Sequence, residues 1–148
     1  MMTKTQRVKP SYELFDHTAD MGIRVTAPTM AELVRPASEG LYAVIGQLAP
    51  DAAEPARPVN WRLTGAEPAV LLRDYLAELL MLFERDHRIV REPVVAEFAP
   101  DRLAVEAQAF KLDQVRSVYQ HEVKAVTYHA LEIAVIPGGY RATIIVDI

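Results

Sequence analysis

The segment LLRDYLAELLMLFE, from Leu71 to Glu84, carries the clearest folding signal in the sequence. Its large apolar side chains recur at steps of three and four residues, which gathers them on one face of a helix, at Leu72, Tyr75, Leu76, Leu79, Leu80 and Phe83. Pro68 stands near the first helical position, where the missing N–H of proline costs no hydrogen bond. The pattern predicts a long amphipathic helix with one buried face.

A second helix is predicted to begin near Thr29. Thr29 and Glu32 match a capping box, in which the two side chains satisfy free N–H groups at a helix start. Apolar residues then follow with helical spacing, at Leu33, Ala37, Leu41, Val44 and Ile45. Pro36 conflicts with an uninterrupted helix, because proline in a helix interior costs about 3 kcal/mol. We therefore expect a kink or a late helix start at this proline.

The remaining apolar segments have the composition and alternation of β-strands. They lie at 12–15, 21–25, 59–64, 88–91, 94–98, 102–110, 122–128, 130–135 and 140–148. The proline-rich stretch 46–58 is predicted to be a loop, and Pro137-Gly138-Gly139 to close a terminal hairpin. This order of elements predicts a single α+β domain over 12–148, with a mainly antiparallel or mixed sheet packed against two helices. Residues 1–11 are predicted to form a flexible N-terminal arm.

The composition is typical of one globular domain. The chain has 148 residues, of which 51% are hydrophobic and 24% charged, so its core needs no disulfide or structural zinc. The absence of cysteine excludes thiol catalysis. A net charge of −4 argues against nonspecific binding of a phosphate backbone, so a partner would hold any RNA. The longest run of strong hydrophobes, 79–83, is too short to span a membrane, and we expect a cytoplasmic protein without a membrane partner.

The sequence lacks the usual catalytic signatures, including the nucleophile elbow, the zinc-protease motif, the P-loop and the dinucleotide fingerprint. What remains is a set of carboxylates and histidines at predicted strand ends. The first group, Asp16, His17 and Asp20, lies in a predicted loop. A short segment of this kind serves either for turn hydrogen bonds or for metal binding, and the residues alone leave both interpretations open.

The segment HEVKAVTYH, from His121 to His129, contains a second group of polar residues. On an extended strand its two histidines lie roughly 26 Å apart, so they share no metal unless the strand breaks. Strand alternation places Lys124 among apolar neighbours. Its amine would either extend past a sheet edge into solvent or bind a phosphate or a partner's carboxylate.

The sequence ends on Asp147 and Ile148, directly after the apolar run Ile144-Ile145-Val146. A chain end is usually solvated, but this one follows a predicted core strand. The side chain of Asp147 and the α-carboxylate of Ile148 would then be two hard oxygen donors, which suit calcium or magnesium.

Taken together, these segments resemble the archease family from about Tyr12 to Ile148. The resemblance is carried by FDHTADMGI (15–23), LLRDYLAELLMLFE (71–84), HEVKAVTYH (121–129) and the terminal IIVDI. It implies the α+β archease fold. It also implies a non-enzymatic role in activating the RNA-splicing tRNA ligase, by promoting guanylylation of the ligase with GTP and its multiple turnover in tRNA splicing or RNA repair. RNA would be contacted only through the ligase.

The resemblance also assigns site residues. The metal ligands of the family fall on Asp20, Asp147 and Ile148, with calcium as the first expectation and magnesium or manganese as alternatives. The functional lysine falls on Lys124, and Asp16 and His17 are expected to assist contact with the ligase.

Two alternatives and two departures accompany this interpretation. The chain would otherwise be a metal-dependent hydrolase that uses Asp16, Asp20 and Asp147 with His17 as general base, or a general chaperone-like module. Pro36 interrupts a helix that the family usually keeps continuous. The segment 111–120 lacks the loop with glycine and histidine expected before Lys124, which would alter how this protein meets its ligase.

Overall fold

The described part of the chain begins with an antiparallel hairpin, whose second strand lies in the middle of the larger sheet. The computed structural model describes residues 6–148. The larger sheet has the order β1 (Ser11–His17), β2 (Asp20–Ala27), β10 (Gly139–Asp147). The free edge of β10 pairs with two further strands in succession, β8 (Ala125–Val126) and β9 (Glu132–Ile136). All of these pairings are antiparallel, as predicted.

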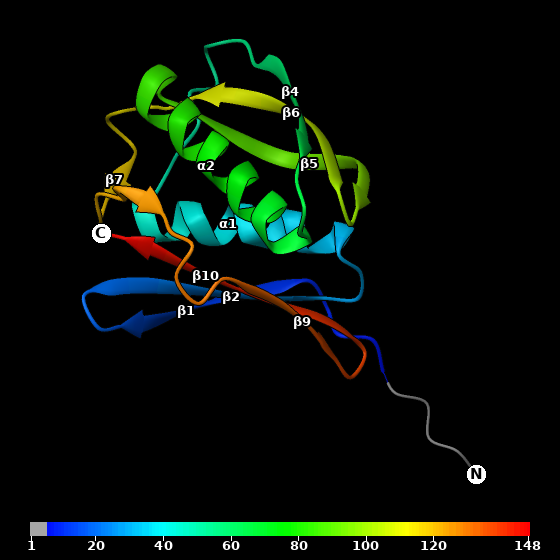
Figure 1. The fold of residues 1–148 in the computed structure, drawn as a ribbon. Coiled ribbons are helices and arrows are strands. Elements are labelled where there is room, and N and C mark those ends of the chain that lie inside the picture. Colours follow the sequence, from blue (N-terminus) through cyan, green and yellow to red (C-terminus); the bar gives the residue numbers. More distant parts are fainter. Residues whose placement is uncertain (1–5) are drawn as a thin grey trace.

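A second sheet of three antiparallel strands lies on the other side of the helices (Figure 1). Its order is β4 (Arg57–Thr64), β6 (Arg102–Lys111), β5 (Arg88–Ala99). The two segments predicted as separate strands, 88–91 and 94–98, belong to the single strand β5, whose register with β6 is irregular between them. A small ladder pairs β3 (Gly46–Gln47) with β7 (Val118–Tyr119), so the stretch 46–58 predicted as loop contains one short strand and the first two residues of β4.

The two predicted helices form the middle layer (Figure 1). The helix α2 (Pro68–Asp86) has Pro68 in its first turn and buries the predicted face. Near Thr29 the chain first makes a short 3₁₀ turn, η1 (Ala31–Leu33), and α1 (Val34–Ile45) follows. The hydroxyl of Thr29 accepts the Glu32 N–H at 3.2 Å, which is one half of the predicted capping box, whereas the Glu32 carboxylate accepts from that hydroxyl and not from a backbone N–H. Pro36 falls in the first turn of α1, where its missing N–H costs nothing, which confirms the late start.

One hydrophobic core joins the three layers. It contains side chains from both helices and both sheets, among them Ile23, Leu41, Leu76, Leu103 and Ile144. No helix within residues 6–148 combines the length and the apolar character that crossing a membrane requires. Of the predicted arm, residues 1–5 lie outside the described residues. The N–H of Val8 donates to the carbonyl of Gly138 at 3.2 Å, which attaches the part after residue 5 to the β9–β10 turn.

Candidate functional site

Three distant segments of the chain meet at one end of the larger sheet. They are the β1–β2 turn, the last residues of β10 and the residues just before β8, and Figure 1 shows the chain end near this turn. Val146 pairs with Met21, so the next position of the same ladder sets Asp147 beside Asp20. The N–H of Lys124 donates to the carbonyl of Asp147 at 2.7 Å. The backbone therefore brings together the residues that were predicted as a site from separate parts of the sequence.

Asp20 and Asp147 lie on the face of the sheet that points away from the helices. Val146 is fully buried against the helical layer, and successive side chains of a strand point to opposite faces. Cross-strand neighbours are about 4.5–5.5 Å apart, and two like charges at that distance repel one another. A divalent cation would relieve that repulsion, and the hard carboxylate oxygens fit calcium, magnesium or manganese.

Among residues 6–148, no three histidine, aspartate or glutamate side chains lie close enough to hold a metal by themselves. A cation between Asp20 and Asp147 would therefore need further oxygen donors. The α-carboxylate of Ile148 is the nearest in sequence, and backbone carbonyls and water are the usual additions for calcium. The three predicted metal ligands therefore remain a prediction. Two of them, Asp20 and Asp147, lie side by side on neighbouring strands.

The pairing of β1 with β2 separates the two polar residues at the end of β1. His17 pairs with Asp20 and shares its face, whereas Asp16 pairs with Met21 and belongs to the opposite face. The turn itself is only Thr18 and Ala19, so the predicted loop over 16–20 was too long. The three carboxylates of the hydrolase alternative are therefore divided between two faces of the sheet.

The strand predicted over 122–128 was wrong, because only Ala125 and Val126 pair with β10. Val123 and Val126 are both buried, at a spacing of three residues rather than two. Strand β9 occupies the next part of the same edge, so the chain must turn away after Thr127. The hydroxyl of Thr127 donates to the Ile145 carbonyl at 2.9 Å and closes that turn. Lys124 is exposed, and the alternation that placed it among apolar side chains does not hold.

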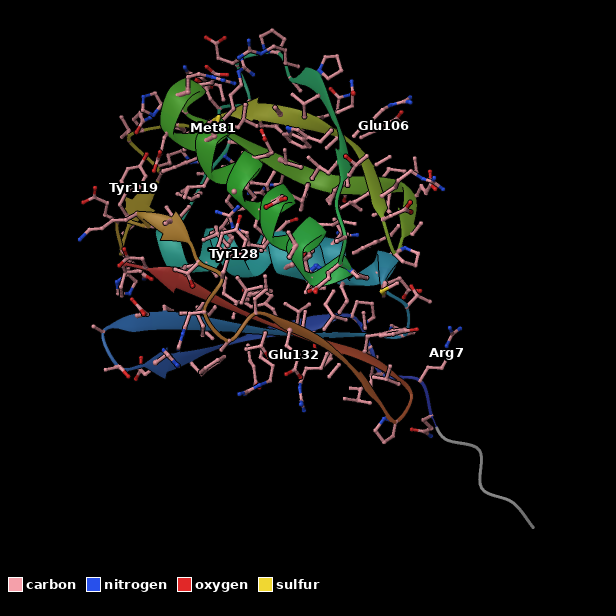
Figure 2. The ribbon with its side chains drawn as sticks, viewed as in Figure 1. Arg7, Met81, Glu106, Tyr119, Tyr128 and Glu132 are labelled. Carbon is pink, nitrogen blue, oxygen red and sulfur yellow. The ribbon has the colours of Figure 1, made fainter. Side chains whose placement is uncertain are left out.

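Arg73 of α2 anchors the segment that carries Lys124. Its Nε donates to the Val126 carbonyl at 2.9 Å, and its guanidinium lies 4.3 Å from the centre of the Tyr128 ring. Figure 2 shows Tyr128 beside the helical layer. Asp74 pairs with the same guanidinium at 2.8 Å. Arg73 was not predicted as a site residue, because the partners of its side chain, Val126 and Tyr128, are distant in sequence.

Four large apolar side chains of α2 and of the segment 115–119 are exposed, and we call Met81, Val115, Val118 and Tyr119 together the apolar patch. Their exposed fractions run from 47% for Tyr119 to 94% for Val115. Figure 2 shows Met81 and Tyr119 on the same side of the molecule. Three of the four belong to the segment around 111–120 that was predicted to differ from the family, and Tyr119 packs 6.2 Å from the Phe83 ring centre.

Comparison with known proteins gives concordant results. The sequence matches the model of the Archease protein family (MTH1598/TM1083) over residues 12–148. A protein archease of Methanosarcina barkeri is 34% identical over 141 residues, which cover 93% of this chain and 95% of the relative.

Two solved structures have the same fold. The solution structure of Methanobacterium thermoautotrophicum protein 1598 is similar with a TM-score of 0.68 and 26% identity, over 93% of this chain and 99% of that chain. A crystal structure from Thermotoga maritima, described as an archease and possible chaperone, has a TM-score of 0.66 and covers 92% of this chain and 96% of its own. At 15% identity this second likeness concerns the fold alone. With the family match and the Methanosarcina relative, these findings show that the chain belongs to the archease family.

Proposed function

We propose that this chain is an accessory protein that activates an RNA-splicing ligase, by promoting guanylylation of the ligase with GTP and thereby its multiple turnover. Membership of the archease family over residues 12–148 supports the proposal. The observation that carries it is the meeting of three segments at one end of the larger sheet: the Asp20 turn, the Lys124 segment and the end of β10.

A divalent cation at this end is part of the proposal. Asp20 and Asp147 would hold it together with the α-carboxylate of Ile148, with calcium as the first choice and magnesium or manganese as alternatives. A bound cation would supply positive charge and open coordination positions for an oxygen ligand of the partner. The register of β2 with β10 would hold Asp20 beside Asp147. The N–H of Lys124 fixes the Asp147 carbonyl, next to the last residue.

Lys124 would make direct contact with the ligase or with its nucleotide. Its side chain is exposed, while its backbone is held against β10, so the amine is positioned by the sheet but free to bind an anion. A phosphate or a carboxylate is the natural partner of a lysine in this situation. RNA would be bound by the ligase, because the net charge of −4 does not favour a phosphate backbone on this protein.

The direct test is formation of the ligase–GMP adduct from GTP with limiting divalent metal. We expect a faster reaction when this protein is added to the ligase of the same organism. Equal rates with and without it would remove the proposal. Phosphatase and nuclease assays on the isolated protein test the hydrolase alternative, which requires turnover without any ligase.

A general chaperone-like role is the second candidate, favoured by the apolar patch. An exposed apolar surface of this kind is typical of a protein-binding site. This candidate predicts that the protein slows aggregation of unrelated unfolded proteins, and that Tyr119→Ser together with Val118→Ser removes the effect. Ligase activation without any effect on aggregation would exclude it.

A further inference from the structure

Two histidines from distant parts of the chain meet on the outer face of the larger sheet. His17 is the last residue of β1, and His129 lies in the turn between β8 and β9. Their ring centres are 5.2 Å apart, with the planes inclined at 59°. The Nδ1 atom of His17 is buried and has no hydrogen-bond partner. Aromatic packing explains the distance between the rings but leaves this buried nitrogen unsatisfied.

Backbone pairing and hydrogen bonds hold the two segments that carry the histidines. Ile145 is fully buried although it belongs to the outer face, where the Phe15 ring lies over its cross-strand neighbour Gly22. The turn that carries His129 is tied to the same strand, because the hydroxyl of Thr127 donates to the Ile145 carbonyl and accepts the His129 N–H at 3.2 Å. The backbone at both histidines is therefore fixed by hydrogen bonds to the larger sheet.

The distance between the rings matches shared coordination of one ion. A zinc–nitrogen bond of about 2.05 Å places the ring centre about 3.2 Å from the metal, so two imidazoles at a tetrahedral angle have centres roughly 5.2 Å apart. A lone pair of the unpartnered Nδ1 would gain the partner that it lacks. Imidazole nitrogen suits zinc and similar transition ions, whereas calcium requires oxygen.

We propose that His17 and His129 bind a transition-metal ion of the zinc type, through nitrogen ligands that the neighbouring calcium site proposed on Asp20 and Asp147 does not use. Within residues 6–148 no third histidine, aspartate or glutamate side chain completes the set. The ion would thus keep open coordination positions for water or for an anionic group of a partner, as a site with few protein ligands does. The sequence has no cysteine, so no thiolate competes for the metal.

The test uses the full chain without a polyhistidine tag, stripped of metal, and Co²⁺ as the spectroscopic probe. We expect a saturable visible absorption band that zinc displaces and excess calcium does not. His17→Gln and His129→Gln should each lose the band. His121→Gln is the matched control, because His121 is exposed and borders a different groove, beside Phe83 and Tyr119.

The carboxylate variants separate this proposal from the one above. Asp20→Asn and Asp147→Asn should lose calcium binding and keep the Co²⁺ band. Absence of the band in the unmodified protein, or an unchanged band in His129→Gln, would overturn the proposal. Loss of the band in Asp20→Asn would also overturn it, since the ion would then belong to the carboxylate site. Circular dichroism checks folding, and His129→Gln, in an exposed turn, serves if His17→Gln fails to fold.

Discussion

Single residues at the end of the larger sheet decide whether the proposed cation site exists. Extending the β2–β10 register by one step beyond the Met21–Val146 pair sets Asp20 beside Asp147. Calcium should raise the thermal stability of the protein, since a ligand that binds only the folded state stabilises it by about 2.7 kcal/mol at one hundred times its Kd. Asp20→Asn and Asp147→Asn should abolish this shift in melting temperature.

A peptide tag after Ile148 should reduce the rise in melting temperature that calcium causes, because it converts the proposed α-carboxylate ligand into a neutral amide. A tag at the N-terminus is the matched control. Equal calcium affinity, by calorimetric titration, in the native and C-terminally tagged proteins would show that the α-carboxylate is not a ligand.

Substitution of Lys124 tests the proposed contact with the ligase without changing the proposed metal ligands. Lys124→Met keeps the aliphatic length of the side chain and removes its charge, so folding and calcium binding should be unchanged while ligase activation is lost. Lys9→Met is the control, as it removes an exposed charge next to Val8, which bonds to the β9–β10 turn. If ligase–GMP formation with Lys124→Met matches that of the native protein, Lys124 is a solvated edge residue.

At the scale of elements, Arg73 links α2 to the segment from Val126 to Tyr128. Arg73→Met should cost about 1–2 kcal/mol of unfolding free energy, because charged hydrogen bonds to a carbonyl and a tyrosine hydroxyl are lost. Hydrogen exchange should accelerate at the Lys124 and Thr127 amides, which bond to β10. Arg85→Met, at the exposed end of α2, is the control. Unchanged exchange at both amides would contradict the anchoring role.

Sequence periodicity predicted the helices and strands that bury only one face. Local rules account for the helix α2, for the start of α1 that leaves Pro36 in its first turn, and for the hairpin of β9 and β10. The strand over 122–128 was wrong for a reason outside the local pattern. Two segments share one edge of β10, and only the tertiary arrangement determines where the first must end.

The candidate site was likewise predicted from the sequence only in part. Asp20, Asp147 and Lys124 were proposed from their places at strand ends and from the family resemblance, and the register brings their backbones together. The contact between His17 and His129 could not be predicted, because it depends on a turn that follows a broken strand. Arg73 was missed because its partners are distant in sequence, so nothing local distinguishes it from a solvated arginine.

At the scale of the whole molecule, a buried hydroxyl pair connects the two helices. Ser38 of α1 and Tyr75 of α2 share a hydrogen bond of 2.9 Å, and burial raises the pKa of Tyr75 well above its usual value. In the unfolded chain this phenol ionises near pH 10, whereas the folded protein keeps it neutral. The folded state therefore holds a proton that the unfolded state releases, and its stability must fall as the pH rises above 10.

Urea unfolding at pH 9 and pH 11 measures this dependence. Tyr75 should contribute about 1–2 kcal/mol to the loss of unfolding free energy between these values. Tyr75→Phe removes the titrating group and should show a correspondingly smaller loss, after its own cost of about 1 kcal/mol for the missing hydrogen bond. An identical pH dependence in the two proteins would contradict the buried, neutral state of this tyrosine.

The most direct measurement of the proposed activity is a multiple-turnover ligation assay with the ligase of the same organism, excess RNA ends and GTP. We predict that product exceeds one equivalent per ligase only when this protein is present. The Asp147→Asn and Lys124→Met variants should leave the reaction at a single turnover. Repeated turnover by the ligase alone, or full activation by both variants, would contradict the proposal that this end of the sheet activates the ligase.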